Sequence, residues 1–131
     1  MRDGGRISAA LQVLADMDTR HKPSRLALKA WGDASRFAGA KDRAFVSGLV
    51  LDALRRKRSL GWRMGDESWR GVVLGVLSLD WGWSSERLAE ACSDETHGPG
   101  KLTPAEWAVL EEPKSLLDAP APTFPRPFQD D

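Results

Sequence analysis

Apolar residues recur at intervals of three and four along most of this sequence, and this spacing constrains the fold more than any other feature. The clearest example is a single helical stripe between residues 6 and 19, formed by Ile7, Ala10, Leu11, Leu14 and Met17. No segment has the alternating β-branched pattern that is typical of a strand. The sequence therefore predicts an all-α fold.

Five further helices are predicted, which makes about six in total. Their expected starts or caps are Pro23, Lys41, Asp66, Ser84 or Ser85, and Thr103. The helix from Lys41 to about Gly61 carries apolar residues over half of its circumference and is therefore expected in the core. Thr103-Pro104-Ala105-Glu106 has the pattern of a capping box with proline in the first turn. Gly71 and Gly75 lie one turn apart and would let another segment approach the fourth helix closely.

The length and the distribution of proline predict one domain followed by a linker. A chain of 131 residues is long enough for a single core but too short for a second full domain. We expect the helical domain over residues 4–117. Residues 118–131 contain the whole segment APAPTFPRPFQDD, whose prolines lack amide donors, and they are expected to form an extended linker that is mobile from about Ala119 onward.

The net charge of zero results from a cancellation between the two halves of the chain. Residues 1–64 contain 14 Lys and Arg against 6 Asp, a net charge of +8, and residues 65–131 carry a net charge of −8. Such an asymmetry favours a polyanionic partner for the basic half. The alternative is that the two halves face each other in the fold and neutralise one another.

The sequence contains no enzymatic signature and no membrane-spanning segment. The longest uncharged apolar run, Gly71 to Leu79, is too short to cross a bilayer, and the first residues do not resemble a signal peptide, so the cytoplasm is the expected compartment. Cys92 is the single cysteine, which excludes an internal disulfide and a thiolate metal cluster within the chain. No nucleotide-binding, nucleophile-elbow or zinc-protease motif occurs. We therefore assign no catalytic, metal-binding or cofactor-binding residue.

Four consecutive cations, Arg55 to Arg58, follow directly on the apolar residues of the helix expected over 41–61. On a continuous helix most of them lie on the side away from the core, as a basic ridge that could hold guanidinium groups against phosphates. The candidate RNA-binding residues are Lys41, Arg43, Arg55, Arg56, Arg58 and Arg63. A solvated basic face, or arginines that pair with the acidic half, is the alternative. Trp62 is either a platform for a base or a packing residue at the helix end.

Two segments, GGRISAALQVLADMDTRHKPSRLALKAW and KDRAFVSGLVLDALRRKRSL, resemble the amino-terminal helical domain of the Fmu/Sun family of bacterial ribosomal RNA cytosine-C5 methyltransferases. That domain is similar in fold to the antitermination factor NusB. The resemblance covers residues 4–117, and its most specific part is Asp42-Arg43-Ala44 followed by Leu49-Val50 and Leu54-Arg55. Leu51 departs from the family, which often has an aromatic residue there.

The resemblance implies a NusB-like bundle that helps to bind structured ribosomal RNA. In the family this domain precedes, in the same chain, a Rossmann-type catalytic domain that binds S-adenosylmethionine and carries cysteines in Pro-Cys and Thr-Cys motifs. Cys92 stands between Ala91 and Ser93 and matches neither motif, so we expect a noncatalytic accessory domain cut off from its enzyme. Two alternatives remain open: a free-standing NusB-like antitermination protein, and a structural module that packs on the catalytic domain without touching RNA.

Overall fold

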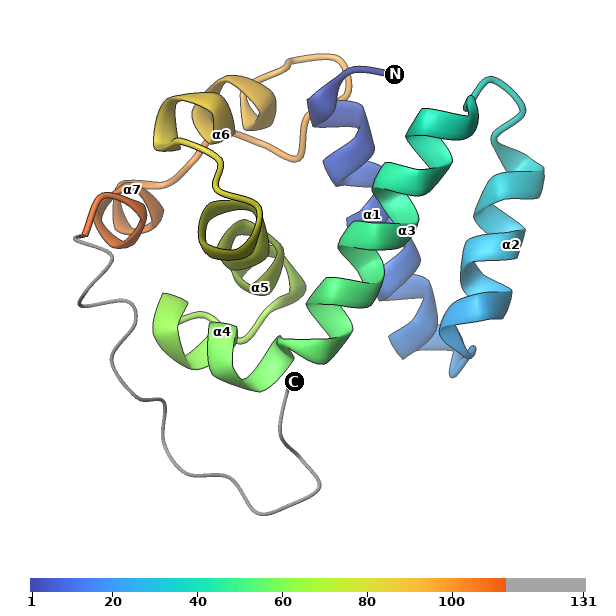
Figure 1. Cartoon of the computed structure of the whole chain (residues 1–131), viewed down its shortest axis with the longest axis horizontal. Helices are drawn as coiled ribbons and strands as arrows, with labels where there is room; N and C mark the ends of the chain where they lie inside the picture. Colours follow the sequence, from blue (N-terminus) through green and yellow to red (C-terminus); the bar gives the residue numbers. More distant parts are fainter. Residues whose placement is uncertain (113–131) are drawn as a thin grey trace.

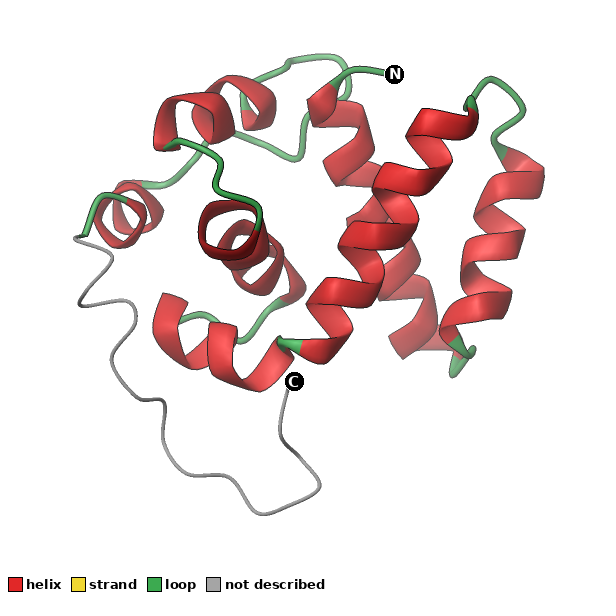
Figure 2. Ribbon diagram, in the orientation of Figure 1, coloured by secondary structure: helices red, strands yellow, loops and turns green. Residues whose placement is uncertain are grey.

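The computed structural model describes residues 1–112 and contains helices but no strand within them (Figure 2). The all-α class is thereby confirmed for this part of the chain. In chain order the elements are α1 (Asp3–Arg20), α2 (Ser24–Ala34), α3 (Ala40–Arg55), α4 (Lys57–Met64), α5 (Trp69–Gly75), the π-helical turn η1 (Val76–Asp80), α6 (Ser85–Cys92) and α7 (Pro104–Leu110) (Figure 1). The linker expected over 118–131 and the end of the expected domain at residue 117 lie outside the described residues.

The centre of the molecule is the helix α5 with the turn η1 that continues it. All residues from Gly71 to Ser78 are buried, and this segment packs against α1, α3, α4 and α6 (Figure 1). Val72, Val73 and Leu74 are consecutive, so they point to different sides of the helix, and all three are buried. The helix is therefore enclosed all round.

The longest helices, α1 and α3, pack against each other beside α5. Their contact is built from fully buried residues that include Ile7, Leu14, Leu49 and Val50. Helix α2 covers the outer side of this pair and buries only Ala27 and Gly32 (Figure 1). The described part of the chain therefore has a dense core around α5 and a thinner edge at α2.

The prediction of a continuous helix over 41–61 is wrong, because the structure divides this segment at Arg56 into α3 and α4. Arg56 has φ −105° and ψ 13°, and α4 begins at Lys57 in a new direction. The break lets Leu60 and Met64 face α5, where a Cβ placed on Gly75 would lie 3.3 Å from the Leu60 Cβ. Packing against α5 thus overrides the local helix propensity of the basic residues.

Two of the predicted helix caps are confirmed, and two helix starts are corrected. The Thr103 hydroxyl accepts from the Glu106 amide while the Glu106 carboxylate accepts from the Thr103 amide, and Ser84 caps α6. Ser68, rather than Asp66, caps α5, because Asp66 instead accepts the Ser68 amide at 2.9 Å in a local turn. Helix α1 begins at Asp3, three residues before the expected start.

Arg70 and Glu106 fasten α7 and the loop before it to the start of α5. The Arg70 guanidinium donates to both Glu106 carboxylate oxygens, at 2.7 and 3.0 Å. It also donates to the carbonyl oxygens of Pro99, Gly100 and Lys101 at 2.9 to 3.0 Å. The hydrogen bond from Arg70 lowers the pKa of Glu106, and that same bond raises the pKa of Arg70. Arg70 therefore ties the end of this loop to α5, in addition to the loop's own backbone bonds from Gly98 to Asp94 and from Gly100 to Cys92.

We expect Gly71→Ala to lower the free energy of unfolding by about 1–3 kcal/mol, because a Cβ at Gly71 would lie 2.6 Å from the Asp66 Cβ and also meet the Asp66 carbonyl. Gly48→Ala is the matched control. Its Cβ would make only ordinary contacts at 3.7 Å with Trp81, so the better helix propensity of alanine should stabilise the protein by up to about 1 kcal/mol. Urea unfolding measures both, and equal effects would contradict the close approach at Gly71.

Glu106→Gln should destabilise the protein by about 1.5–3 kcal/mol at pH 7, because hydrogen bonds between charged groups are lost. The folded-state pKa of Glu106 is lowered, so its contribution is complete above the ordinary value of 4.5 and is lost as the pH falls through the folded-state pKa. The difference between parent and variant should therefore shrink below about pH 4.5. Unfolding measured from pH 7 to pH 3 tests this, with the exposed Glu111→Gln as control; a difference that stayed constant would contradict it.

Candidate nucleic-acid interface

The six predicted RNA-binding residues fall into two separate groups. Lys41 and Arg43 lie in the first turn of α3, whereas Arg55 ends that helix. Fourteen residues separate Lys41 from Arg55, or about 21 Å along the helix axis. Arg56 lies at the junction, and Arg58 and Arg63 belong to α4. The single ridge expected from the sequence is therefore replaced by one cation pair at the start of α3 and a larger group around α4.

The Arg43 guanidinium makes hydrogen bonds to backbone carbonyls within the domain. Its Nε donates to the Ala38 carbonyl at 3.1 Å, and its Nη2 donates to the Gly32 carbonyl at 3.0 Å. Gly32 makes room for this guanidinium, because a Cβ there would lie 2.6 Å from the Arg43 Nη1. Arg43 thus satisfies carbonyl groups at the end of α2, which is a capping role that favours a cation. Lys41 is exposed beside it and makes no ion pair within residues 1–112.

Arg55 and Arg56 each meet an acidic partner. Arg55 pairs with Asp52 one turn earlier on α3, and the Arg56 Nη1 lies 2.7 Å from the Asp80 Oδ1 at the end of η1. The second Asp52 oxygen accepts the Trp81 indole N–H at 2.8 Å. These five residues line one shallow hollow. Of these two pairs, only Arg56–Asp80 joins the basic half of the chain to the acidic half, because Asp52 belongs to residues 1–64.

The exposure of the two arginine side chains separates their roles. The Arg55 side chain is 65% exposed, and an ion pair of this kind contributes only about 0–1 kcal/mol. The Arg56 side chain is 19% exposed and also donates to the Ser59 hydroxyl at 3.3 Å. Arg55 can therefore exchange Asp52 for another anion at little cost, whereas Arg56 fixes the α3–α4 junction to η1.

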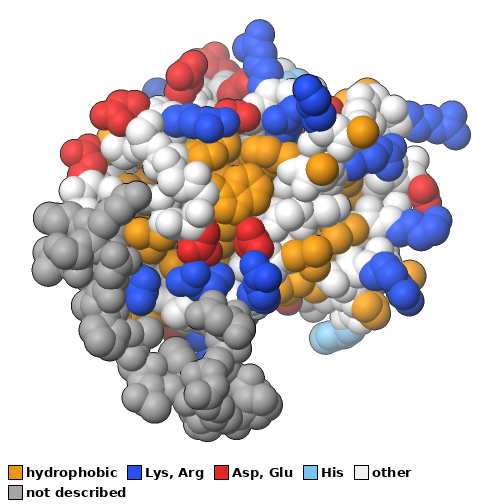
Figure 3. Space-filling model, viewed as in Figure 1, with side chains coloured by type: hydrophobic (Ala, Val, Ile, Leu, Met, Phe, Trp, Pro, Cys, Tyr) orange, Lys and Arg blue, Asp and Glu red, His pale blue; other side chains and the backbone are white. Residues whose placement is uncertain are grey.

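Helix α4 carries cations without any acid. Its eight residues include Lys57, Arg58 and Arg63, while Leu60 and Met64 are buried against the core. Arg58 is exposed, and the Lys57 Nζ lies 4.8 Å from the centre of the Trp69 ring. We call Arg55, Lys57, Arg58 and Arg63 the α4 cationic surface. Figure 3 shows basic side chains gathered over the end of α3 and α4, below the hydrophobic centre of this face.

An aromatic cluster that the sequence did not predict joins α3 to the segment after η1. Phe45 contacts Trp81 edge-on with ring centres 5.1 Å apart, and its ring centre lies 5.9 Å from that of Trp83. Arg6 lies over Phe45 at 5.2 Å, and Arg87 lies over Trp83 at 3.6 Å. The three contacts of Phe45 span more than 35 residues of sequence, so no local pattern could have indicated them. Arg6 and Arg87 also cover one face each of Phe45 and Trp83.

The two arginines of this cluster also form ion pairs with carboxylates. The Arg6 Nε donates to the buried Asp42 at 2.7 Å, and this bond is the main reason why the pKa of Asp42 is lowered. Arg87 donates to Asp3 at 3.2 Å. Arg6 and Arg87 are thus held by both a carboxylate and an aromatic ring. Their positions favour a structural role over phosphate binding.

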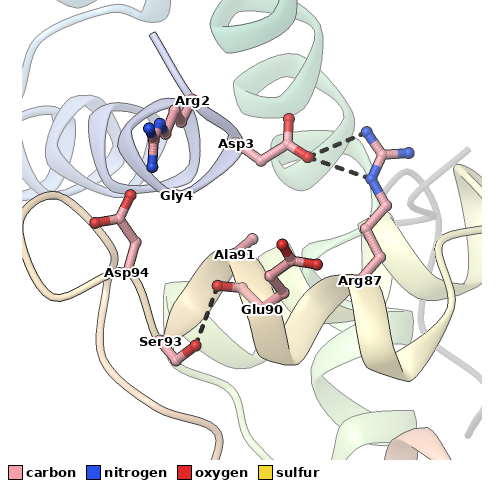
Figure 4. A pocket seen from close by; sticks show the side chains of 8 residues that line it. All are labelled: Arg2, Asp3, Gly4, Arg87, Glu90, Ala91, Ser93 and Asp94. Carbon is pink, nitrogen blue, oxygen red and sulfur yellow. Dashed lines mark hydrogen bonds and ion pairs between the residues drawn. The ribbon is translucent and has the colours of Figure 1, made fainter.

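A pocket of about 450 Å³ lies between the start of α1 and α6 (Figure 4). Arg2 and Arg87 line it together with the carboxylates of Asp3, Glu90 and Asp94, and Arg87 reaches across to Asp3. Backbone amides of Thr96 and His97 bond to Asp94 and lower its pKa. Three carboxylates against two guanidinium groups make this pocket unsuited to a phosphate.

The acidic, histidine and cysteine side chains of residues 1–112 are the groups that could form a metal site or supply a reactive thiol. No group of three or more His, Cys, Asp or Glu side chains comes together there in a way that could hold a metal ion. Cys92 is fully buried in the last turn of α6, and burial raises the pKa of its thiol, which disfavours the reactive thiolate. None of the described helices combines the length and the apolar character needed to span a bilayer.

Comparison with known proteins gave no match to any family model, curated protein or solved structure. A function for this chain is therefore inferred from its own residues and from the sequence resemblance given above.

Arg56→Ala should lower the free energy of unfolding by about 1.5–3 kcal/mol, because it leaves Asp80 without its charged partner at a half-buried junction. Arg55→Ala, its neighbour and matched control, should cost no more than about 1 kcal/mol. Chemical denaturation followed by circular dichroism compares the two variants. Equal losses would mean that Arg56 does not hold the junction.

Proposed function

We propose that this chain is a noncatalytic RNA-binding accessory domain, NusB-like in its helical arrangement, of an S-adenosylmethionine-dependent ribosomal RNA cytosine-C5 methyltransferase. The family assignment rests on the resemblance of residues 4–117, including Asp42-Arg43-Ala44 and Leu49-Val50. The RNA contact rests on one observation: Arg55 at the end of α3 and Arg58 on α4 are exposed, and α4, whose Leu60 and Met64 are anchored in the core, contains no acidic residue.

The anchoring matters because it holds the cations in place before RNA arrives. Leu60 is fully buried and Met64 nearly so, which fixes the direction of α4. Planar guanidinium groups on a fixed helix can bind phosphate oxygens with little loss of conformational entropy. Contacts of this type provide affinity and orientation but little sequence discrimination. The domain would therefore position structured RNA, and target selection would depend on other parts of the enzyme.

In this proposal the chemistry belongs to a catalytic domain in the same protein. That domain would bind S-adenosylmethionine and supply the catalytic cysteines, and residues 1–112 would contribute neither. The free-standing antitermination protein shares the RNA contact and differs in its partner. The genomic sequence that follows this chain distinguishes the two, since a continuing reading frame with Pro-Cys and cofactor motifs favours the methyltransferase.

A second candidate, the structural module, is favoured by exposed apolar side chains on α2, on α3 and in the loop between them. Phe37 in that loop is 75% exposed, and Leu26 on α2 and Leu51 on α3 are also exposed. Where such groups form a contiguous patch, they mark a protein contact. The catalytic domain could pack there while RNA binds at α4, so the two roles are compatible.

Charge reversal tests the RNA contact directly. Arg55→Glu with Arg58→Glu should weaken the binding of structured RNA by about tenfold or more, irrespective of sequence, because two phosphate contacts are lost. The slope of log affinity against log salt should flatten by about two units. Fluorescence anisotropy titrations at several salt concentrations measure both quantities.

The control carries the same change in net charge on another face. Arg25→Glu with Arg36→Glu reverses two exposed arginines on the α2 side and should affect RNA affinity much less. Both double variants should keep the helical circular dichroism and the melting temperature of the parent. If the two affect affinity equally, binding depends on net charge alone and the α4 cationic surface is not the site.

A further inference from the structure

Trp62 is the most exposed of the six tryptophans, all of which lie within the described residues. It is 44% exposed, whereas Trp83 is buried and the other four are partly buried. Trp69 and Trp81 donate their indole N–H groups to Asp18 at 2.6 Å and to Asp52 at 2.8 Å. Within residues 1–112 the Trp62 indole makes no such hydrogen bond. A large ring is thus left at the surface while its counterparts are used in the fold.

The surroundings of Trp62 indicate what kind of partner would cover it. Arg58 precedes Trp62 by four residues and therefore lies on the same side of α4. Leu60, Gly61 and Met64 face the core, so the anchored helix presents the indole rather than a mobile loop. A ring flanked by cations on an acid-free helix complements a base with its adjoining phosphates better than it complements an apolar protein surface.

We propose that Trp62 is a stacking platform for one unpaired base of the bound RNA, with the flanking phosphates held by Arg55 and Arg58. This inference rests on the proposed function and refines it by naming the RNA element. The bases of a perfect A-form duplex are stacked on each other and offer no free face, whereas loops and bulges do. The α4 cationic surface would therefore prefer RNA with unpaired nucleotides over a continuous duplex of equal charge.

Two RNA probes with the same number of phosphates test this, a hairpin with a single-stranded loop and a fully paired duplex. The whole chain should bind the hairpin more tightly. Trp62→Leu keeps an apolar side chain but removes the aromatic face, and it should weaken hairpin binding about 5- to 150-fold while leaving duplex affinity and the salt slope unchanged. Trp62→Phe should stay within a few-fold of the parent. Phe37→Ala, which removes another exposed aromatic ring, is the control and should have no effect.

The outcomes separate this inference from the function on which it rests. If the parent binds both probes equally and Trp62→Leu changes neither affinity, the stacking proposal is wrong but RNA binding stands. If the parent binds neither probe, both proposals fail. If Trp62→Leu leaves RNA affinity unchanged but abolishes a self-association seen by sedimentation, the Trp62 face is a protein contact and the stacking proposal is also wrong.

Discussion

The fold depends on a helix that is apolar on every side. Residues 71–78 are buried without interruption, so the other helices enclose α5 and η1 on every side. The polar contacts that organise the molecule lie at the two ends of this segment. Arg70 at its start holds Glu106 and the loop before α7, and Asp80 at its end holds Arg56. The central segment therefore determines where both the C-terminal helix and the α3–α4 junction lie.

The surface chemistry follows from the same segment. Glycines at 71 and 75 leave room for Asp66 and for Leu60 and Met64, so α4 lies closer to α5 than larger side chains would allow. This contact buries one side of α4 and turns Arg58 and Trp62 outward. The π-helical turn closes with the bond from the Trp81 amide to the Val76 carbonyl. At its end Asp80 accepts from Arg56, and Trp81 donates to Asp52 on α3. Cation placement on this face is thus a consequence of core packing.

Local signals in the sequence were sufficient for some features and not for others. The spacing around Ile7 and the capping box at Thr103 depend on neighbouring residues, and both predictions are confirmed. The break at Arg56 has no local signal, because Arg and Lys favour helix and only the packing of Leu60 on Gly75 requires the bend. Arg43 belonged to the predicted basic ridge, but its guanidinium turns toward the end of α2. Asp80 is 24 residues from Arg56, so their pairing becomes visible only in the fold.

Because Cys92 is buried, the reactivity of its thiol reports local unfolding around α6. Cys92 is fully buried, its carbonyl accepts the amide of Gly100 in the loop before α7, and Arg70 donates to the Gly100 carbonyl of that loop. A thiol reagent can reach the sulfur only when this part of the structure separates. Because the chain has a single cysteine, the rate of its alkylation reports the free energy of one defined local opening. Local opening around Cys92 can therefore be measured on the natural sequence, without introducing a label elsewhere.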